Sequence, residues 1–357
     1  MVINLGRTRN WYYLQETTGP RENARDNYTE NNKQKRNEVQ PLCYFCSFLG
    51  AMAKIIQFLD RYFGLFLIAG MIMGLINPVY SSRLMPLLEP ALMFMLFMVF
   101  LKTDVTHILQ KMKNYRQVLF FTFMYMLAIP VFFYLTALPF DRNTAIGLML
   151  LTAMPAGAAS PALTDIARGN TALSASIVIT TSLIAPLTVP LLFRLLSISD
   201  LSVNYWLVFR DLAMLIFIPL LASQIIKRCC SSFIIKTSHL FTSLNVLILT
   251  GMVYAIIGSQ RETILNEPVA ILWQTVVLYV VFILLHLIGY LIGFKEDRKG
   301  KIATAVSAAY MNNAMAIVLA AVYFPSVLVL MVLSEIPWNT LLMPFRKIVN
   351  HQTHKRD

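Results

Sequence analysis

Charged residues are scarce in this chain. Asp, Glu, Lys and Arg make up 13% of its 357 residues, whereas 57% are hydrophobic. Water-soluble domains contain about 25% charged residues, so a soluble globular fold is excluded. The four cysteines include a single C-x-x-C pair, Cys43 and Cys46, without a second pair or a nearby histidine, which does not favour a metal site. Walker A, G-x-G-x-x-G and H-E-x-x-H motifs are absent, so neither ATP hydrolysis nor enzymatic catalysis is supported.

Long apolar runs are present instead, and the mean hydropathy is +0.63. A helix needs roughly 20 apolar residues to cross a bilayer. Ten stretches meet this requirement: 62–80, 85–103, 116–138, 143–167, 171–196, 205–226, 238–258, 268–293, 301–324 and 326–346. The sequence therefore predicts an all-α integral membrane protein with ten transmembrane helices.

Basic residues are unevenly distributed between the two sets of loops. The four on one side are Arg83, Arg142, Arg194 and Arg261. The sixteen on the other side, beyond residue 61, are Lys102, Lys111, Lys113, Arg116, Arg168, Lys227, Arg228, Lys236, Lys295, Arg298, Lys299, Lys301, Arg346, Lys347, Lys355 and Arg356. This bias predicts a plasma-membrane protein with both termini in the cytoplasm. The net charge of +12 then indicates contact with anionic lipid headgroups rather than with nucleic acid.

The N-terminal segment has a different composition. Residues 1–50 are rich in Asn, Arg, Glu and Gln and lack apolar periodicity, which predicts a disordered cytoplasmic tail. Met52 opens a short helical lead into the first span and is a candidate functional start; a genuine tail upstream of it is the alternative. The membrane domain is expected at 51–349, followed by a second cytoplasmic tail at 350–357.

Two of the apolar runs contain helix-breaking or polar interruptions. The fourth run contains Pro155 to Pro161 (PAGAASP), and the ninth contains Tyr310 to Ala314 (YMNNA). A broken helix is tolerated at membrane depth only where it lines a protein-enclosed cavity. Five spans per half give the second half the opposite orientation, as in inverted-repeat carriers. We therefore expect two inverted five-helix repeats whose broken fourth and ninth helices cross at mid-membrane and form the transport site.

The residues of the interruptions suggest their chemistry. Pro155 and Gly157 leave backbone groups uncovered, and Ser160 adds a hydroxyl, so that carbonyls could bind a cation while the following half-helix suits an anion. A packed proline kink is the structural alternative. Asn312 and Asn313 bring amides into an apolar run, where they either contact a ligand or join helices.

Glu335 is an ionisable group near the middle of the tenth run. Burial disfavours the charged form of a carboxyl group, which makes Glu335 a candidate for proton coupling. His286 in the eighth run is more typical of a hydrogen-bonded core histidine than of a proton relay.

Gly147–Leu196 resembles the fourth and fifth spans of the bile acid:sodium symporter family. The resemblance lies in the Pro-x-Gly break before a serine and in the turn Ala167–Asn170 (ARGN), and Leu101–Val105 also matches the family. It implies a panel of spans 1, 2, 6 and 7 and a core of spans 3, 4, 5, 8, 9 and 10. The broken helices would cross in the core at the substrate and ion site, and panel and core would move against each other.

The family's sodium ligands are only partly retained. Ser160 and Ser174 match hydroxyls that bind sodium in relatives. The remaining ligand positions hold Pro161, Val178, Ser307, Met311 and Tyr125 in place of an asparagine, a threonine, an acidic residue and two glutamines. This sequence therefore favours sodium coupling less than proton coupling.

The related arsenite permeases provide a second comparison. Their paired asparagines and their Glu-x-Pro resemble Asn312, Asn313 and Glu335–Pro337, but Ala156 stands where a cysteine is expected.

We expect a secondary transporter that moves a small organic anion or oxyanion by alternating access. Its coupling ion would be H⁺ rather than Na⁺, with no other cofactor and no metal. An arsenite-type exporter and a transport-inactive membrane sensor are the alternatives, and the oligomeric state is open. The expected substrate and ion site comprises Pro155, Gly157, Ser160, Ser174, Ser307, Asn312 and Asn313, with Glu335 as the proton-coupling residue.

Overall fold

A computed structural model describes residues 63–103, 115–196 and 204–351. The predicted tail 1–50 and the last six residues lie outside this part of the chain. The first half contains α2 (Phe63–Ile76), α3 (Ser81–Leu84), η1 (Met85–Leu87), α4 (Leu88–Lys102), α6 (Tyr115–Phe123), the π-helical η2 (Met124–Ala128), α7 (Ile129–Ala137), α8 (Arg142–Thr152), α9 (Ser160–Ile166) and α10 (Thr171–Leu195).

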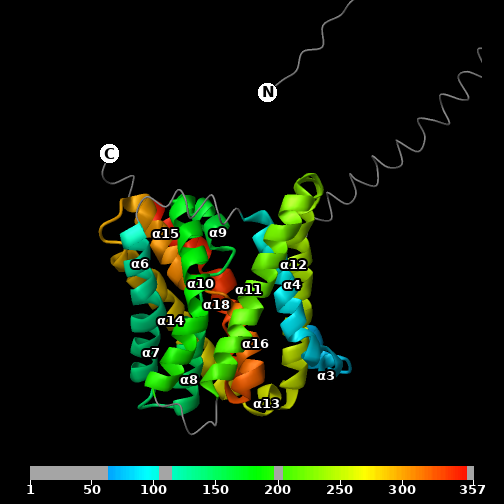
Figure 1. The fold of residues 1–357 in the computed structure, drawn as a ribbon. Helices are drawn as coiled ribbons and strands as arrows, with labels where there is room; N and C mark the ends of the chain where they lie inside the picture. The colour runs from blue at the N-terminus through cyan, green and yellow to red at the C-terminus, as the bar shows by residue number, and fades with distance from the viewer. Residues whose placement is uncertain (1–62, 104–114, 197–203, 352–357) are drawn as a thin grey trace, which may run out of the picture. The chain divides into compact units, whose positions relative to one another are not determined.

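The second half is also helical (Figure 1). It contains α11 (Tyr205–Cys229), α12 (Ser231–Ser259), α13 (Arg261–Asn266), α14 (Pro268–Ile292), α15 (Arg298–Ala309), α16 (Asn313–Tyr323), η4 (Pro325–Val327), α17 (Leu328–Leu333), α18 (Glu335–Thr340) and α19 (Leu342–His351).

The predicted all-α membrane class is confirmed. Seven helical stretches of the described residues are long and apolar enough to cross a membrane: Ser81–Lys102, Tyr115–Ala137, Thr171–Leu195, Tyr205–Cys229, Leu240–Ser259, Pro268–Ile292 and Pro325–Val349. The other three predicted spans correspond to shorter helices, namely α2, the pair α8 and α9, and the pair α15 and α16. These pairs are short because each predicted span is interrupted, as the polar breaks indicate.

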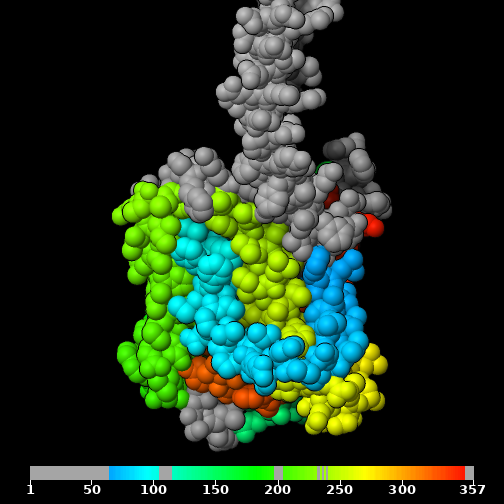
Figure 2. Space-filling view, turned by 90° about the vertical axis from the view of Figure 1, so that its right-hand side faces the viewer, coloured from blue at the N-terminus to red at the C-terminus, as the bar shows by residue number. Residues whose placement is uncertain are grey.

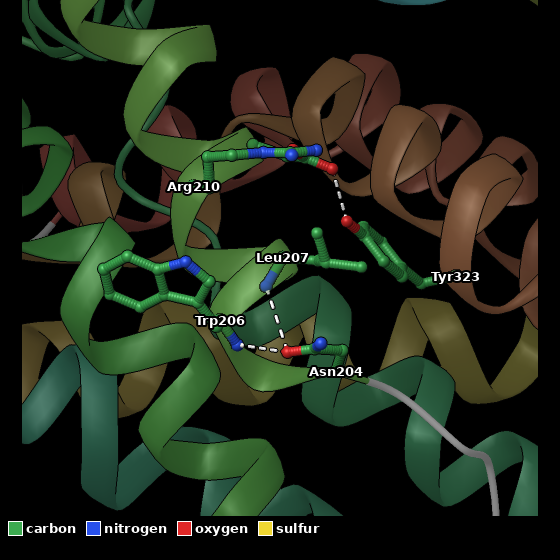
Figure 3. Close-up of polar contacts among 6 residues, drawn as sticks. Asn204, Trp206, Leu207, Arg210 and Tyr323 are labelled. Atoms are coloured by element: carbon green, nitrogen blue, oxygen red, sulfur yellow. Dashed lines mark hydrogen bonds and ion pairs between the residues drawn. The ribbon is translucent and has the colours of Figure 1, made fainter.

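Side-chain caps explain where many of the helices begin. Asp141, Asn170, Asn204, Asp297 and Asn312 each accept a hydrogen bond from a backbone N–H in the first turn of α8, α10, α11, α15 and α16. Figure 3 shows the Asn204 cap, in which Oδ1 accepts from the N–H groups of Trp206 and Leu207 at 3.0 and 3.4 Å. Such caps pair N–H groups that have no partner within the helix.

The helices form two groups. In the first group, α2, α4, α11 and α12 pack on one another, and Figure 2 shows these four helices along one face. The second group contains α6 to α10 and α14 to α19. The groups meet where α10 packs on α11, α4 on α16 and α12 on α17.

Glycines allow close helix packing in the first group. A Cβ atom at Gly70 would lie 2.9 Å from the carbonyl oxygen of Thr250, and one at Gly74 would lie 2.8 Å from that of Tyr254. The G-x-x-x-G spacing therefore places α2 directly against the backbone of α12.

The two ends of the helix bundle differ in charge. α4 and α11 end, and α15 begins, at the end that carries Lys102, Lys227, Arg228, Arg298, Lys299 and Lys301, and we call it the basic end. α11 begins and α16 ends at the opposite end, together with α3 and α13 (Figure 1). Between them, the outward faces of the helices are apolar, as at Phe132, Ile218 and Ile283.

Candidate functional site

The two interrupted helices meet in the second group. α8 ends at Thr152 and α9 begins at Ser160, while α15 ends at Ala309 and α16 begins at Asn313. The N–H of Gly157 donates to the carbonyl of Tyr310 at 2.7 Å, and the N–H of Asn312 donates to the carbonyl of Pro155 at 2.8 Å. These bonds form a short antiparallel bridge between Ala156 and Met311. The structure therefore brings together two segments that lie 155 residues apart in the sequence, and we call this contact the crossing.

Gly157 is required at this position because the two backbones are in close contact. A Cβ atom there would lie 2.8 Å from the carbonyl oxygen of Tyr310 and 2.9 Å from that of Met311. Real Cβ atoms essentially never approach backbone oxygen this closely. The glycine of the Pro-x-Gly break thus has a packing function at the crossing.

Side chains from other helices pair with the backbone groups that the breaks release. The carbonyl of Met154 accepts from the hydroxyl of Tyr125 at 2.8 Å, and the carbonyl of Met311 accepts from Nε1 of Trp338 at 3.3 Å. The N–H of Ala156 donates to Oγ1 of Thr181 at 3.1 Å. Buried backbone groups without partners are costly, so these three side chains stabilise the broken helices.

Ser160 also pairs with the backbone at the crossing. Its Oγ donates to the carbonyl of Tyr310 at 2.9 Å, and that oxygen already accepts from Gly157. The carbonyl oxygens of Met154, Pro155, Tyr310 and Met311 therefore all accept hydrogen bonds from protein groups. A cation could bind these oxygens only by displacing those donors.

Ser174 and Ser307 form a separate polar pair. Their Oγ atoms lie 3.0 Å apart, from α10 and α15, and both residues are fully buried. Each hydroxyl can donate to or accept from the other. The pair joins two helices of the second group. Ser307 lies one turn before Tyr310, the residue that follows α15.

The two asparagines of the second break have different roles. Oδ1 of Asn312 caps α16 by accepting from the N–H of Met315 at 3.2 Å. Nδ2 of Asn313 donates to Oγ of Ser334 at 3.0 Å and so joins α16 to the start of α18, while its Oδ1 is buried without a partner. Asn313 is thus an interhelical contact that retains one unused acceptor.

Glu335 is buried beside Asn313, with 4% of its surface exposed. Nδ2 of Asn339 donates to its Oε2 at 3.4 Å and to its backbone carbonyl at 2.7 Å. The structure therefore places one amide against the candidate proton-coupling carboxyl. Asn313 connects this carboxyl group to the crossing, because it directly follows the second break and donates to Ser334, the residue before Glu335.

The ARGN turn connects the first broken helix to α10. Arg168 has a φ of 65°, and the N–H of Gly169 donates to the carbonyl of Thr164 at 2.8 Å, which closes α9 in the manner of a Schellman motif. A Cβ atom at Gly169 would lie 2.7 Å from Cγ2 of Thr164. The left-handed residue of the turn is therefore Arg168, and the glycine at position 169 allows close packing on Thr164.

Sequence reasoning missed Thr181 and Trp338, and it treated Tyr125 only as a replaced ligand. Thr181 and Trp338 are ordinary residues of their spans, and a sequence pattern does not show which backbone they contact. His286 has the character of a core residue: its Nδ1 lies 2.7 Å from the carbonyl of Phe282, and its ring packs on those of Tyr310 and Phe345.

Two interrupted helices that cross within a multi-pass apolar bundle are typical of membrane transporters. The Sodium Bile acid symporter family model matches residues 89–267. The chain belongs to this family, which is a family of transporters rather than of enzymes. The chain is also 30% identical over 186 residues to a Bacillus subtilis (strain 168) protein described as the uncharacterized sodium-dependent transporter YocS. The matched region covers 50% of this chain and 56% of that protein.

Proposed function

We propose that the protein is a secondary transporter that moves a small organic anion or oxyanion across the plasma membrane by alternating access. The paired breaks at the crossing carry this proposal. Their released backbone groups lie inside an apolar bundle and are paired by protein groups, and paired helix breaks of this kind form the substrate sites of inverted-repeat carriers. The site comprises Pro155, Gly157, Ser160 and Asn312 at the crossing, together with the Ser174–Ser307 pair and Asn313.

The proposed topology has ten spans in two inverted repeats. The first repeat contains α2, α3 with α4, α6 with α7, α8 with α9, and α10. The second contains α11, α12, α14, α15 with α16, and the segment from η4 to α19. Each repeat has its break in the fourth span, which supports the symmetry. The basic end faces the cytoplasm in this topology, following the positive-inside rule.

We further propose that protons, rather than sodium ions, drive transport through Glu335. Two observations support this choice: the carbonyl oxygens at the crossing accept hydrogen bonds from the chain's own donors, and the buried carboxyl group lies next to the second break. The description of the Bacillus subtilis relative as sodium-dependent supports sodium coupling as the second candidate.

Flux measurements in proteoliposomes test both candidates. Purified protein is first screened for thermal stabilisation by organic anions and arsenite, and the best solute is then driven by an imposed pH gradient or sodium gradient. We expect uptake with the pH gradient and its loss in Glu335→Gln, which keeps the side-chain shape but cannot exchange a proton. Glu89→Gln, an exposed glutamate in the first turn of α4, is the matched control.

The outcomes separate the candidates. Uptake that requires sodium and survives Glu335→Gln would establish sodium coupling and refute the role of Glu335. Strong uptake of arsenite alone would favour the arsenite-type exporter. Thermal stabilisation without flux under either gradient would favour a transport-inactive sensor on the same fold.

A further inference from the structure

A polar contact joins the two helix groups in the half of the bundle that lies between the crossing and the opposite end. The hydroxyl of Tyr323, the last residue of α16, donates to Oδ2 of Asp211 in the second turn of α11. Figure 3 shows the ring of Tyr323 directed toward the first turns of α11, beside Arg210. Tyr323 belongs to the second group and Asp211 to the first.

Arg210 forms an ion pair with the same carboxylate. Its Nη2 lies 2.9 Å from Oδ1 of Asp211, and its Nε donates to the same oxygen at 3.0 Å. The carboxylate thus uses Oδ1 for the guanidinium and Oδ2 for the tyrosine. Hydrogen bonds to a charged acceptor are about twice as strong as those between neutral groups, so this is a strong bond between the two groups.

The position of Tyr323 connects it to the site. α16 begins at Asn313, directly after the crossing, and ends at Tyr323. Its 11 residues form a continuous rod of roughly 16 Å at 1.5 Å per residue. A displacement of α16 relative to α11 would therefore move the tyrosine away from Asp211.

Apolar packing also joins the two helix groups near the opposite end. α4 contacts α16, and α12 contacts α17, and both α16 and α17 lie between the crossing and the opposite end. The two helix groups are therefore held together on this side of the site, and the hydrogen bond adds a directional polar contact to that apolar packing.

We propose that Tyr323 and Asp211 form a latch that keeps the opposite end of the transporter closed and opens once in each transport cycle. This inference rests on the proposed alternating-access function. The latch selects the conformation in which the crossing is closed toward the opposite end. Its loss shifts the population toward the conformation open at that end.

Accessibility of the crossing tests the latch without knowledge of the substrate. The four native cysteines are replaced by serine, and Ala159→Cys, an exposed position directly before α9, reports labelling by a membrane-impermeant thiol reagent added on the opposite-end side. We expect Tyr323→Phe to raise the labelling rate roughly ten- to a hundredfold, as expected for the loss of one hydrogen bond to a charged group. Tyr323→Phe keeps the ring and its packing.

Tyr279→Phe is the matched control. It also removes one tyrosine hydroxyl, which lies 2.9 Å from Oγ1 of Thr340, but both residues belong to the second group. Equal labelling rates in Tyr323→Phe and Tyr279→Phe would overturn the latch, whether or not the protein transports. A raised rate in Tyr323→Phe without flux in any variant would support the latch and refute the proposed transport.

Cross-linking tests the same contact by holding it closed instead of removing it. A short reducible bifunctional thiol reagent applied to Asp211→Cys/Tyr323→Cys should stop flux, and a reductant should restore it. The same reagent on Tyr279→Cys/Thr340→Cys joins two helices of one group and should leave flux unchanged. Continued flux through the cross-linked Asp211→Cys/Tyr323→Cys protein would contradict the latch.

Discussion

At the residue scale, the crossing depends on side chains that either leave room for the backbone or pair with it. Gly157 permits contact with the carbonyls of Tyr310 and Met311. Tyr125, Thr181 and Trp338 pair with backbone groups that a continuous helix would satisfy internally. A broken helix in an apolar bundle therefore needs several distant residues to match, and each of them contributes to the stability of the break.

Gly157→Ala tests this packing. The added Cβ would lie 2.8 Å from a backbone oxygen that cannot rotate away, so we expect a loss of about 1–3 kcal/mol in the free energy of unfolding, as for other overpacked sites. Gly251→Ala in α12 is the control, because its Cβ would meet no atom within 4 Å. Thermal unfolding in detergent should show a lower midpoint for Gly157→Ala and no decrease for Gly251→Ala. Equal midpoints would refute the packing role of Gly157.

At the element scale, capped half-helices determine where the broken spans begin. α8 starts at the Asp141 cap, whose Oδ2 accepts from the N–H of Thr144 at 2.6 Å. Partial burial acts to raise the pKa of this carboxyl group, but hydrogen bonds from Thr144 and Asn143 outweigh it and lower the pKa below its usual 3.8. The ionised carboxylate also interacts favourably with the positive end of the α8 dipole.

This pKa shift predicts a pH dependence of stability. Because the folded-state pKa is depressed, the contribution of Asp141 is present above its unfolded-state pKa and is lost as the pH falls through the folded-state value. Asp141→Asn keeps a capping oxygen without the charge. At pH 6 we expect the free energy of unfolding of the natural chain to exceed that of the variant by a few tenths of a kcal/mol at most, because the site is exposed. Thermal unfolding should show this as a slightly higher midpoint for the natural chain. The difference should shrink as the pH falls below 3.8, and a difference that does not change with pH would contradict this role of Asp141.

The elements also show how far the sequence predicts the structure. Pro155, Gly157 and the Asn312–Asn313 pair predicted both breaks, because proline lacks a backbone donor and both glycine and asparagine have a low helix propensity. The partners of the breaks were not predictable, because Thr181 lies in the apolar α10 and its contact with Ala156 depends on how helices far apart in the chain pack. The tenth run was predicted as one span, and Pro325–Val349 is long and apolar enough to cross a membrane. Its helix is interrupted at Ser334 and Leu341, which the sequence did not predict. Pro186 and Pro190, by contrast, lie within a continuous α10.

At the scale of the whole molecule, the crossing belongs to only one of the two helix groups. The crossing lies entirely within the second group, and its backbone pairs join α8 and α9 to α15 and α16. The first group, which contains the closely packed α2 and α12, contributes no donor to the pairs described at the crossing. Relative motion of the groups could therefore change access to the site without breaking the site itself.

The orientation of the bundle in the membrane follows from the same arrangement and can be tested with α12. Cys229 and Cys230 are exposed at the basic end, just before α12, and Asn266 follows α12 at the opposite end, in α13. Because the basic end should face the cytoplasm, an impermeant thiol reagent should not label Cys229 and Cys230 in intact cells in which Cys43 and Cys46 are replaced by serine. Permeabilisation should expose both.

Asn266→Cys, with all four native cysteines replaced, should label in intact cells. The reverse pattern would place the basic end outside, and labelling of both positions from one side would mean that α12 does not cross the membrane, which would remove the basis for two oppositely oriented repeats.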